Sequence, residues 1–252
     1  MILSQFDLSF VHIHQWLNII FEVGAIGLLE LYPDKLIIKV SNHVNTSFAE
    51  LTIKLDVMMF YQEQIYVNIN LFDVKTFLDE WIKMGFTEGS VQLTTDHLVF
   101  IGNENNESKI PVTFSRTGFV HSSDHFMELD HFACSFHLPE LQNMIRELSV
   151  IGCFATIDVD AQRELALSTI GKRGRLSFQT RNNYSIVQQD DFDHNHPLSV
   201  TISLCDMKMI TLLNTSRGII RIIPDQGFMF ESSNVGGVKL MLCICSNKNT
   251  NI

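Results

Sequence analysis

The sequence predicts an α+β protein made of four copies of one unit, in which antiparallel strands accompany a single amphipathic helix. In four segments the apolar side chains change from a two-residue to a 3.6-residue alternation, which marks a strand that leads into a helix. The helical parts start at equivalent positions, which are Phe10, Phe72, Pro139 and Cys205. Successive starts are 62, 67 and 66 residues apart. This nearly constant spacing is typical of an internal repeat.

The four helices are expected at residues 10–23, 72–84, 139–150 and 205–217. Between them lie short runs rich in β-branched and aromatic residues, bounded by Gly, Asn, Asp and Pro, as in strands joined by turns. These runs are 28–40, 47–56, 91–101, 109–115, 155–160, 165–170, 175–180, 219–224, 228–233 and 238–245. The pattern favours antiparallel sheets with the helices gathered on one face.

Two such units per domain give two similar domains. The segment 118–131, which reads GFVHSSDHFMELDH, follows neither the strand nor the helix period and carries polar and acidic residues. We therefore predict an N-terminal domain at residues 1–117, an interdomain connector at 118–131 and a C-terminal domain at 132–252.

Composition narrows the function classes. With 46% hydrophobic residues the 252-residue chain can bury a large core, and its formal charge of −10 argues against an open basic surface that wraps nucleic acid. The five cysteines have no metal-finger spacing, and an odd number of them favours a reducing, intracellular compartment. No basic leader and no uncharged apolar stretch of about 18 residues is present, so no membrane association is expected.

No catalytic motif is present: the chain lacks GxSxG, HExxH and GxGxxG, so we expect neither enzymatic activity nor a cofactor. One run combines carboxylates and imidazoles, at Asp190, Asp191, Asp193, His194 and His196. It lies in a polar stretch without fixed geometry, and the favoured interpretation is a solvated hairpin tip rather than a metal site.

Three segments carry a resemblance to a known family. They are Asn42-His43-Val44 with the following run AELTIKL, the stretch VNINLFDVKTFL, and LPELQNMIRELSVIG from Leu138 to Gly152. They resemble a Ser-His-Val and its strand, a strand-to-helix passage of the first domain, and the first helix of the second domain in the eukaryotic and archaeal sliding clamps, the proliferating cell nuclear antigen family. The resemblance covers nearly the whole chain. It implies the DNA clamp fold, with two similar domains that each place two helices on one face and form rings.

The resemblance also implies a function. A clamp of this kind is a non-enzymatic processivity factor that encircles double-stranded DNA without regard to sequence and tethers replication and repair proteins. DNA polymerases and other clamp-binding peptides are the implied partners, together with further copies of the chain, most simply as a homotrimer, and a clamp loader is a further candidate. The location would be nuclear in a eukaryote or a nuclear virus and cytoplasmic otherwise.

The expected DNA-binding residues lie on the helices that would line the ring: Lys75, Lys83, Arg146, Lys208 and Arg217, with His12 and His14 on the first helix. The four helical spans carry these five cations and seven anions, a net charge of −2, and the first helix has no Lys or Arg. This weak inner charge keeps two alternatives open within the fold, a subunit of a heterotrimeric checkpoint clamp and a viral processivity factor that forms no ring. A scaffold protein without DNA contact is the alternative from another class.

The resemblance implies two further sites. The client-peptide pocket is expected beside His43, Val44, Phe126, Met241 and Leu242. The subunit interface is expected at two edge strands, one with Lys109, Ile110, Val112 and Phe114, the other with Arg173, Arg175 and Ser177. The chain departs from the family at Ser123-Asp124-His125-Phe126, where an apolar Leu-x-Ile-Pro is usual, and at Leu242-Cys243-Ile244-Cys245, where Leu-Ala-Pro-Lys is usual. The pocket is therefore expected to accept a different client motif.

Overall fold

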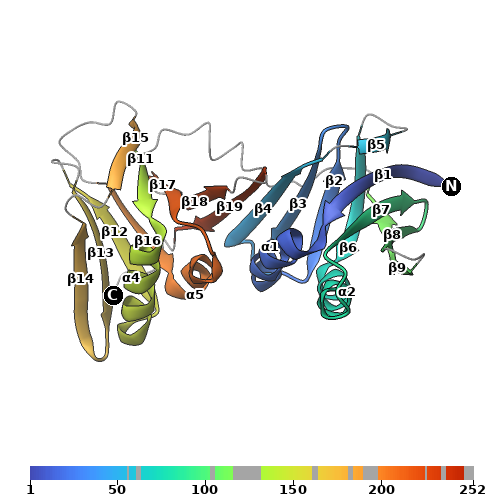
Figure 1. Ribbon diagram of the computed structural model, residues 1–252. Coiled ribbons are helices and arrows are strands. Elements are labelled where there is room, and N and C mark those ends of the chain that lie inside the picture. Colours follow the sequence, from blue (N-terminus) through green and yellow to red (C-terminus); the bar gives the residue numbers. More distant parts are fainter. Residues whose placement is uncertain are drawn as a thin grey trace. The chain divides into compact units, whose positions relative to one another are not determined.

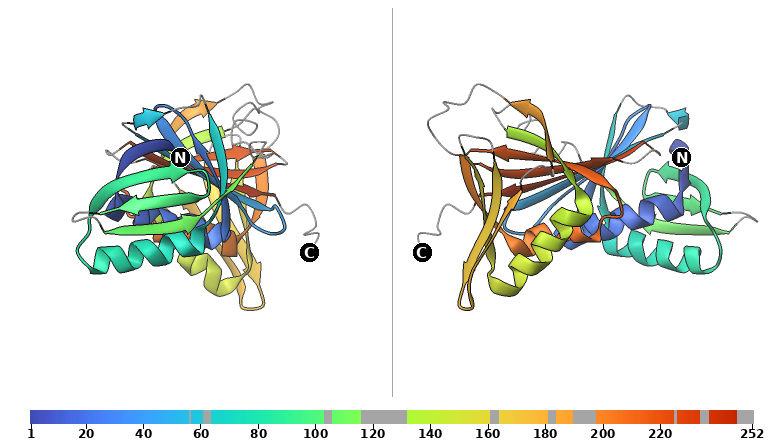
Figure 2. Two further views of the ribbon diagram at one scale, coloured as in Figure 1. Left: turned by 90° about the vertical axis from the view of Figure 1, so that its right-hand side faces the viewer. Right: turned by 60° about the vertical axis from the view of Figure 1, so that its left-hand side comes forward.

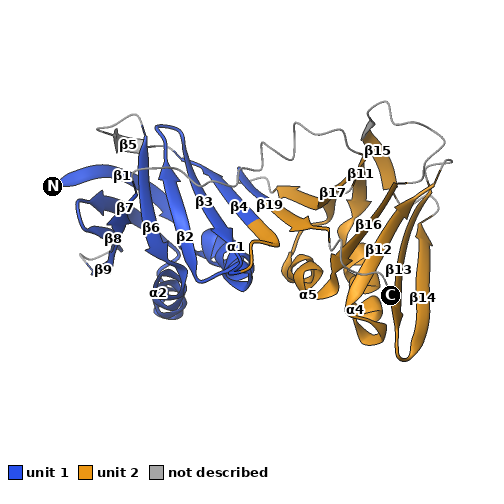
Figure 3. Cartoon of the chain, turned by 180° about the vertical axis from the view of Figure 1, so that it is seen from behind, with its two compact units in different colours: residues 1–43, 49–120, 235–240 blue, residues 44–48, 121–234, 241–252 orange. Residues whose placement is uncertain are grey.

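The structure is a computed structural model that describes the chain apart from residues 56, 61–63, 103–105, 116–131, 161–163, 181–183, 190–197, 225, 234–236 and 247–252. The chain divides into two compact units (Figure 3). Unit 1 comprises residues 1–43, 49–120 and 235–240, and unit 2 comprises residues 44–48, 121–234 and 241–252. No helix among the described residues is long and apolar enough to cross a membrane.

Unit 1 contains two sets of hydrogen-bonded strands (Figure 1). One is a sheet in the order β5 (Val57–Phe60), β1 (Ile2–Ser9), β7 (Glu88–Thr94), β8 (His97–Ile101) and β9 (Glu107–Pro111). The other has the order β10 (Thr113–Phe114), β6 (Ile65–Asn70), β2 (Ile26–Leu31), β3 (Lys35–Ser41) and β4 (Ser47–Lys54). The pairs β1–β7, β7–β8, β8–β9 and β2–β6 are antiparallel, as the sequence pattern predicts.

The two helices of unit 1, α1 (Phe10–Val23) and α2 (Leu71–Lys83), pack against each other. Asn70 caps α2, because its side-chain oxygen accepts a hydrogen bond from the Phe72 N–H at 3.0 Å. Each helix buries an apolar stripe. Phe10 and Phe77 contact Trp81 with ring centroids 5.6 and 4.5 Å apart, which fixes both helices to one aromatic core.

Unit 2 repeats this plan. One sheet has the order β14 (Gly174–Thr180), β13 (Leu165–Gly171), β12 (Phe154–Val159) and β16 (Leu198–Ser203). The other strands follow the order β15 (Tyr184–Gln189), β11 (Phe132–His137), β17 (Arg217–Ile223), β18 (Gly227–Ser233) and β19 (Val238–Cys245), of which residues 241–245 belong to unit 2. Helix α4 (Leu138–Ile151) follows β11 as α1 follows β1.

The last helix is shorter than the sequence predicts. It consists of α5 (Leu204–Met207) and the 3-10 turn η2 (Lys208–Leu212), so the expected end at residue 217 is wrong. The buried side chain of Gln142 on α4 donates hydrogen bonds to the carbonyl oxygens of Ile210 and Leu213, at 3.1 and 2.8 Å. The Ile210 carbonyl also accepts from the Leu213 N–H, and Gln142 satisfies the Leu213 carbonyl where the helix ends. Arg217 consequently lies on β17 rather than on a helix.

The predicted fold class is confirmed: the units are α+β, with antiparallel pairing and helices that begin and end within one residue of the first three expected spans. The expected connector at 118–131 lies outside the described residues, and the proposed domain boundaries remain predictions.

We expect Gln142→Leu to lower the free energy of unfolding by about 1–3 kcal/mol, because two buried carbonyl groups would lose a hydrogen bond and only that of Ile210 would keep another donor, the Leu213 N–H. Chemical denaturation followed by circular dichroism measures this change. The control is Asn143→Leu, an equally polar-to-apolar change on the exposed side of α4, which should alter stability by less than about 0.5 kcal/mol. Equal effects of the two substitutions would contradict the capping role of Gln142.

Candidate functional site

The helix surface of unit 1 is organised around Asp79 on α2. One carboxylate oxygen lies 3.1 Å from Lys75 Nζ, and the other lies 2.5 Å from His14 Nε2 on α1. Partial burial acts to raise the pKa of Asp79, but the hydrogen bonds from Lys75 and His14 outweigh it and hold the pKa below its ordinary value. Two of the expected DNA-binding residues are therefore already engaged with a carboxylate. His12 and Lys83 are exposed on the same pair of helices.

In unit 2 the expected cations are more dispersed. Arg146 is exposed on α4 and donates to the side-chain oxygen of Asn143 at 3.0 Å, and Lys208 is exposed where α5 passes into η2. Because Arg217 is not helical, the helices as observed carry four cations (Lys75, Lys83, Arg146 and Lys208) and seven anions (Glu22, Asp73, Asp79, Glu80, Glu140, Glu147 and Asp206). The helix surfaces are thus even less basic than the sequence suggests.

Strand β9 is an open edge of its sheet in unit 1. The Gly102 N–H donates to the Asn106 carbonyl and the Val112 N–H donates to the Asp96 carbonyl, which fixes the alternation of the β8–β9 ladder. By this alternation Ile110 bonds to Leu98 on β8, whereas Lys109 directs its N–H and C=O away from the sheet. Of the expected interface residues on this strand, Lys109 therefore offers the free backbone, and Ile110 is a buried core residue.

The other two residues expected on this edge lie elsewhere. Strand β9 ends at Pro111, and Val112 leads the chain to β10, which pairs with β6. The Ser115 N–H completes this change of partner by donating to the Tyr66 carbonyl at 3.0 Å. The placement of Val112 and Phe114 on the β9 edge is therefore wrong. The side chain of Phe114 is 40% exposed on β10.

Strand β14 is the matching open edge of a sheet in unit 2. A two-residue turn at Lys172 and Arg173 joins it to β13, so that Gly171 pairs with Gly174. Counting from this pair, the backbone N–H groups of Arg175 and Ser177 point away from β13. Arg175 and Ser177 thus lie on the edge as expected, while Arg173 lies in the turn.

The residues expected around a client pocket differ in exposure. Val44 is 57% exposed and His43 is also exposed, whereas Met241 and Leu242 are buried, with exposed fractions of 6% and 1%. Strand β19 carries buried apolar residues on both of its sides. Met241 and Leu242 therefore do not present their side chains to a client peptide in the single chain. Phe126 lies outside the described residues.

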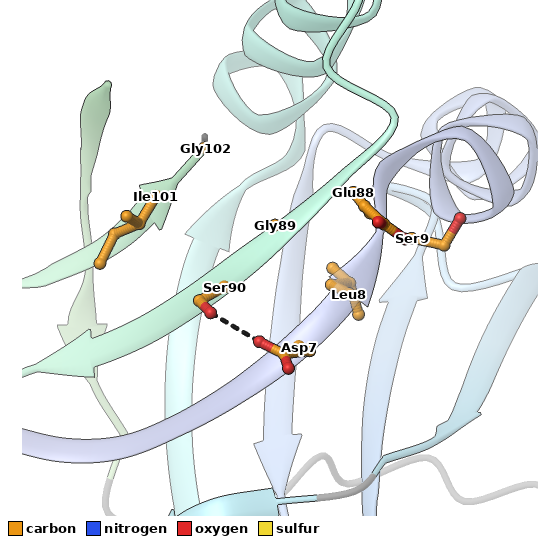
Figure 4. Close-up of a pocket in the computed structure, with 8 residues that line it drawn as sticks. All are labelled: Asp7, Leu8, Ser9, Glu88, Gly89, Ser90, Ile101 and Gly102. Atoms are coloured by element: carbon orange, nitrogen blue, oxygen red, sulfur yellow. Dashed lines mark hydrogen bonds between the residues drawn. The ribbon is translucent and has the colours of Figure 1, made fainter. Parts of the chain in front are cut away.

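Each unit has an open hollow where a strand passes into the helix that follows it. In unit 1 its volume is 490 Å³, and its lining includes Asp7, Glu88 and Ser90, whose hydroxyl donates to Asp7 at 2.5 Å (Figure 4). In unit 2 the volume is 270 Å³, and the lining includes one cation, Arg217, and one carboxylate, Glu231, among serine and threonine hydroxyls. In the strand register Arg217 stands opposite His137 as Glu88 stands opposite Ser9. The two equivalent hollows therefore differ in charge, which single-chain pattern analysis did not predict.

The described residues contain no group of three or more His, Cys, Asp or Glu side chains that could hold a metal ion. The run from Asp190 to His196 lies outside those residues, so its interpretation as a hairpin tip remains a prediction.

Comparison with solved structures identifies the fold. The chain matches the structure of the proliferating cellular nuclear antigen of Entamoeba histolytica with a TM-score of 0.76 and 12% sequence identity, over 98% of this chain and 100% of that one. It matches equally, at 10% identity, a structure of the C-terminal region of FEN-1 bound to the corresponding clamp of A. fulgidus, again with a TM-score of 0.76, 98% of this chain and 100% of that one. The chain has the sliding-clamp fold. No protein-family model and no curated protein sequence matches it.

The clamp fold with two open edges predicts self-association through β9 and β14. We expect a mass close to three times 28.8 kDa at micromolar concentration, measured by light scattering coupled to size exclusion. Ser177→Pro should reduce this mass to that of one chain, because proline removes the outward N–H of the edge. Ser177→Ala keeps that N–H and should leave the mass unchanged. A wild-type protein that is monomeric under these conditions would refute the pairing of the edges.

Proposed function

We propose that this protein is a DNA sliding clamp, a non-enzymatic processivity factor that encircles duplex DNA and tethers other proteins to it. The observation that carries the proposal is the match to clamp structures over 98% of the chain at a TM-score of 0.76. It is supported by two of the edge strands, β9 in unit 1 and β14 in unit 2, since a molecule with two different complementary edges can join head to tail and close into a ring.

The edges suit such a ring chemically. Both present outward backbone donors and acceptors that a further strand can satisfy in place of water. The β9 edge carries Glu107 and Lys109, and the β14 edge carries Arg175, so oppositely charged side chains are available on the two sides of the contact. Lys109 lies 2.9 Å from Glu107 within the free chain, and this ion pair raises the pKa of Lys109. We propose three copies per ring.

The weak charge of the helices bears on how DNA is held. A protein with six to ten phosphate contacts loses roughly three to five orders of magnitude of affinity between 50 and 200 mM salt. The few exposed helical cations here, such as Lys83, Arg146 and Lys208, give less attraction than that, and the acidic chain opposes approach. Retention on DNA would therefore depend mainly on the closed ring.

The proposed clients are DNA polymerases and repair proteins that carry a short peptide with aromatic and aliphatic anchors. One of the matched structures holds the C-terminal region of FEN-1 on a clamp, which supports this mode for the fold. In the present chain the exposed Val44 is the apolar side chain from which such a surface would start. As part of the same proposal, the protein would act in the nucleus, or in the cytoplasm of a cell that has no nucleus.

Two alternative functions are compatible with the same clamp fold. The excess of anions on the helices favours a subunit of a mixed ring, in which other chains supply the basic inner surface, or a processivity factor that does not close a ring. Either alternative predicts that the purified chain alone does not form a homogeneous trimer.

Topological retention is the test of the proposed function. We expect negligible binding to a short linear duplex at about 150 mM salt, and persistent association with a nicked circular plasmid after loading. Linearising the plasmid with a restriction enzyme should release the protein, because a ring can slide off a free end. Fluorescently labelled protein followed by gel filtration measures both states. Equal loss from intact and cut circles would rule out encirclement.

A further inference from the structure

The closed end of the β13–β14 hairpin in unit 2 carries the most concentrated positive charge in the described part of the chain. Lys172, Arg173 and Arg175 are all exposed there within four residues. No Asp or Glu occurs anywhere between Leu165 and Gln189. In a chain with a formal charge of −10, this tip is a local exception.

The tip is held in place rather than free to move. A side chain on Gly171 would meet the carbonyl oxygen of Ile151, and one on Gly152 would meet the Thr169 hydroxyl and the Ile170 carbonyl oxygen. Only glycine permits this close approach, so the hairpin packs directly on the C-terminal end of α4, as Figures 1 and 2 show. Gly174, with φ of +122°, completes the turn in a conformation that other residues rarely adopt.

Helix α4, which contacts both strands of the hairpin, carries one exposed cation of its own. Arg146 is exposed on that helix, and about five residues of helix, roughly 7–8 Å, separate it from the end where the hairpin packs. This length corresponds to about two nucleotide steps of one DNA strand. From Leu148 to Ile157 the sequence contains no charged residue, and the exposed carboxylate of α4 that is nearest to the tip in sequence is Glu147, four residues before the helix end.

The chemistry of the tip fits a phosphate backbone. Two cations in the turn and a third, Arg175, on the adjoining strand give a contact that is electrostatic and independent of sequence. Lys172 and Arg173 lie in the turn, beyond the last paired residues of β13 and β14. Their side chains can therefore contact a phosphate whether or not β14 pairs with another copy of the chain.

We propose that the tip of the β13–β14 hairpin, through Lys172 and Arg173, is a contact for the phosphate backbone of duplex DNA. The identity of this partner rests on the proposed clamp function. In the clamp, the tip would supply attraction to DNA that the weakly charged helices do not provide. The contact itself needs no ring, since all of its residues belong to unit 2.

The test compares two charge-reversed proteins in binding to a fluorescent 30-base-pair duplex at 50 mM salt. One is Lys172→Glu with Arg173→Glu. The other is Lys35→Glu with Lys54→Glu, which makes the same change in net charge on strands β3 and β4 of unit 1. We expect the tip variant to lose at least about tenfold more affinity than the control. Its plot of log affinity against log salt should be shallower by about 1–2, as for one or two lost phosphate contacts.

Two results would overturn the proposal. One is equal binding by the tip variant and the control variant. The other is a tip variant whose assembly mass falls, because that would assign Lys172 and Arg173 to a contact between copies. A wild-type protein that proves monomeric would refute the ring while leaving this comparison intact, since the duplex can be titrated with single chains. A trimer with no effect of the tip would refute the contact and leave the ring.

Discussion

The unsatisfied backbone of two edge strands is the constraint on which the account depends. An exposed strand edge with free N–H and C=O groups invites pairing with any other chain, and proteins normally cover or disrupt such edges. Here β9 directs the backbone of Lys109 outward and β14 directs that of Ser177 outward, in separate units of one chain. Mutual pairing of β9 with β14 would satisfy both of these edges, which is the physical reason for the closed ring that we propose.

Charge is the second constraint, and it acts against DNA binding. The helices carry more carboxylates than cations, and Asp79 engages both Lys75 and His14. A ring lowers the need for direct attraction, because a closed ring stays on DNA without strong phosphate contacts. The basic hairpin tip then supplies a local contact where it is packed on α4, so that weak attraction and topological retention complement each other.

Much of the fold was predictable from sequence because periodicity reports on burial. The helices α1, α2 and α4 bury continuous apolar stripes, and their expected bounds were correct within one residue. The end of the last helix was not predicted correctly. Its last carbonyl groups accept hydrogen bonds from Gln142, which lies about 70 positions earlier in the sequence and reaches them only in the folded chain. The outward direction of Lys109 rather than Ile110, and the departure of Val112 to another sheet, likewise depend on ladder register, which no single-strand pattern contains.

The most direct measurement of the central claim is negative-stain electron microscopy of the purified protein at micromolar concentration. The account predicts one class of closed rings with threefold symmetry and a central hole wide enough for duplex DNA. A field of separate single chains, or of open chains without closure, would contradict it.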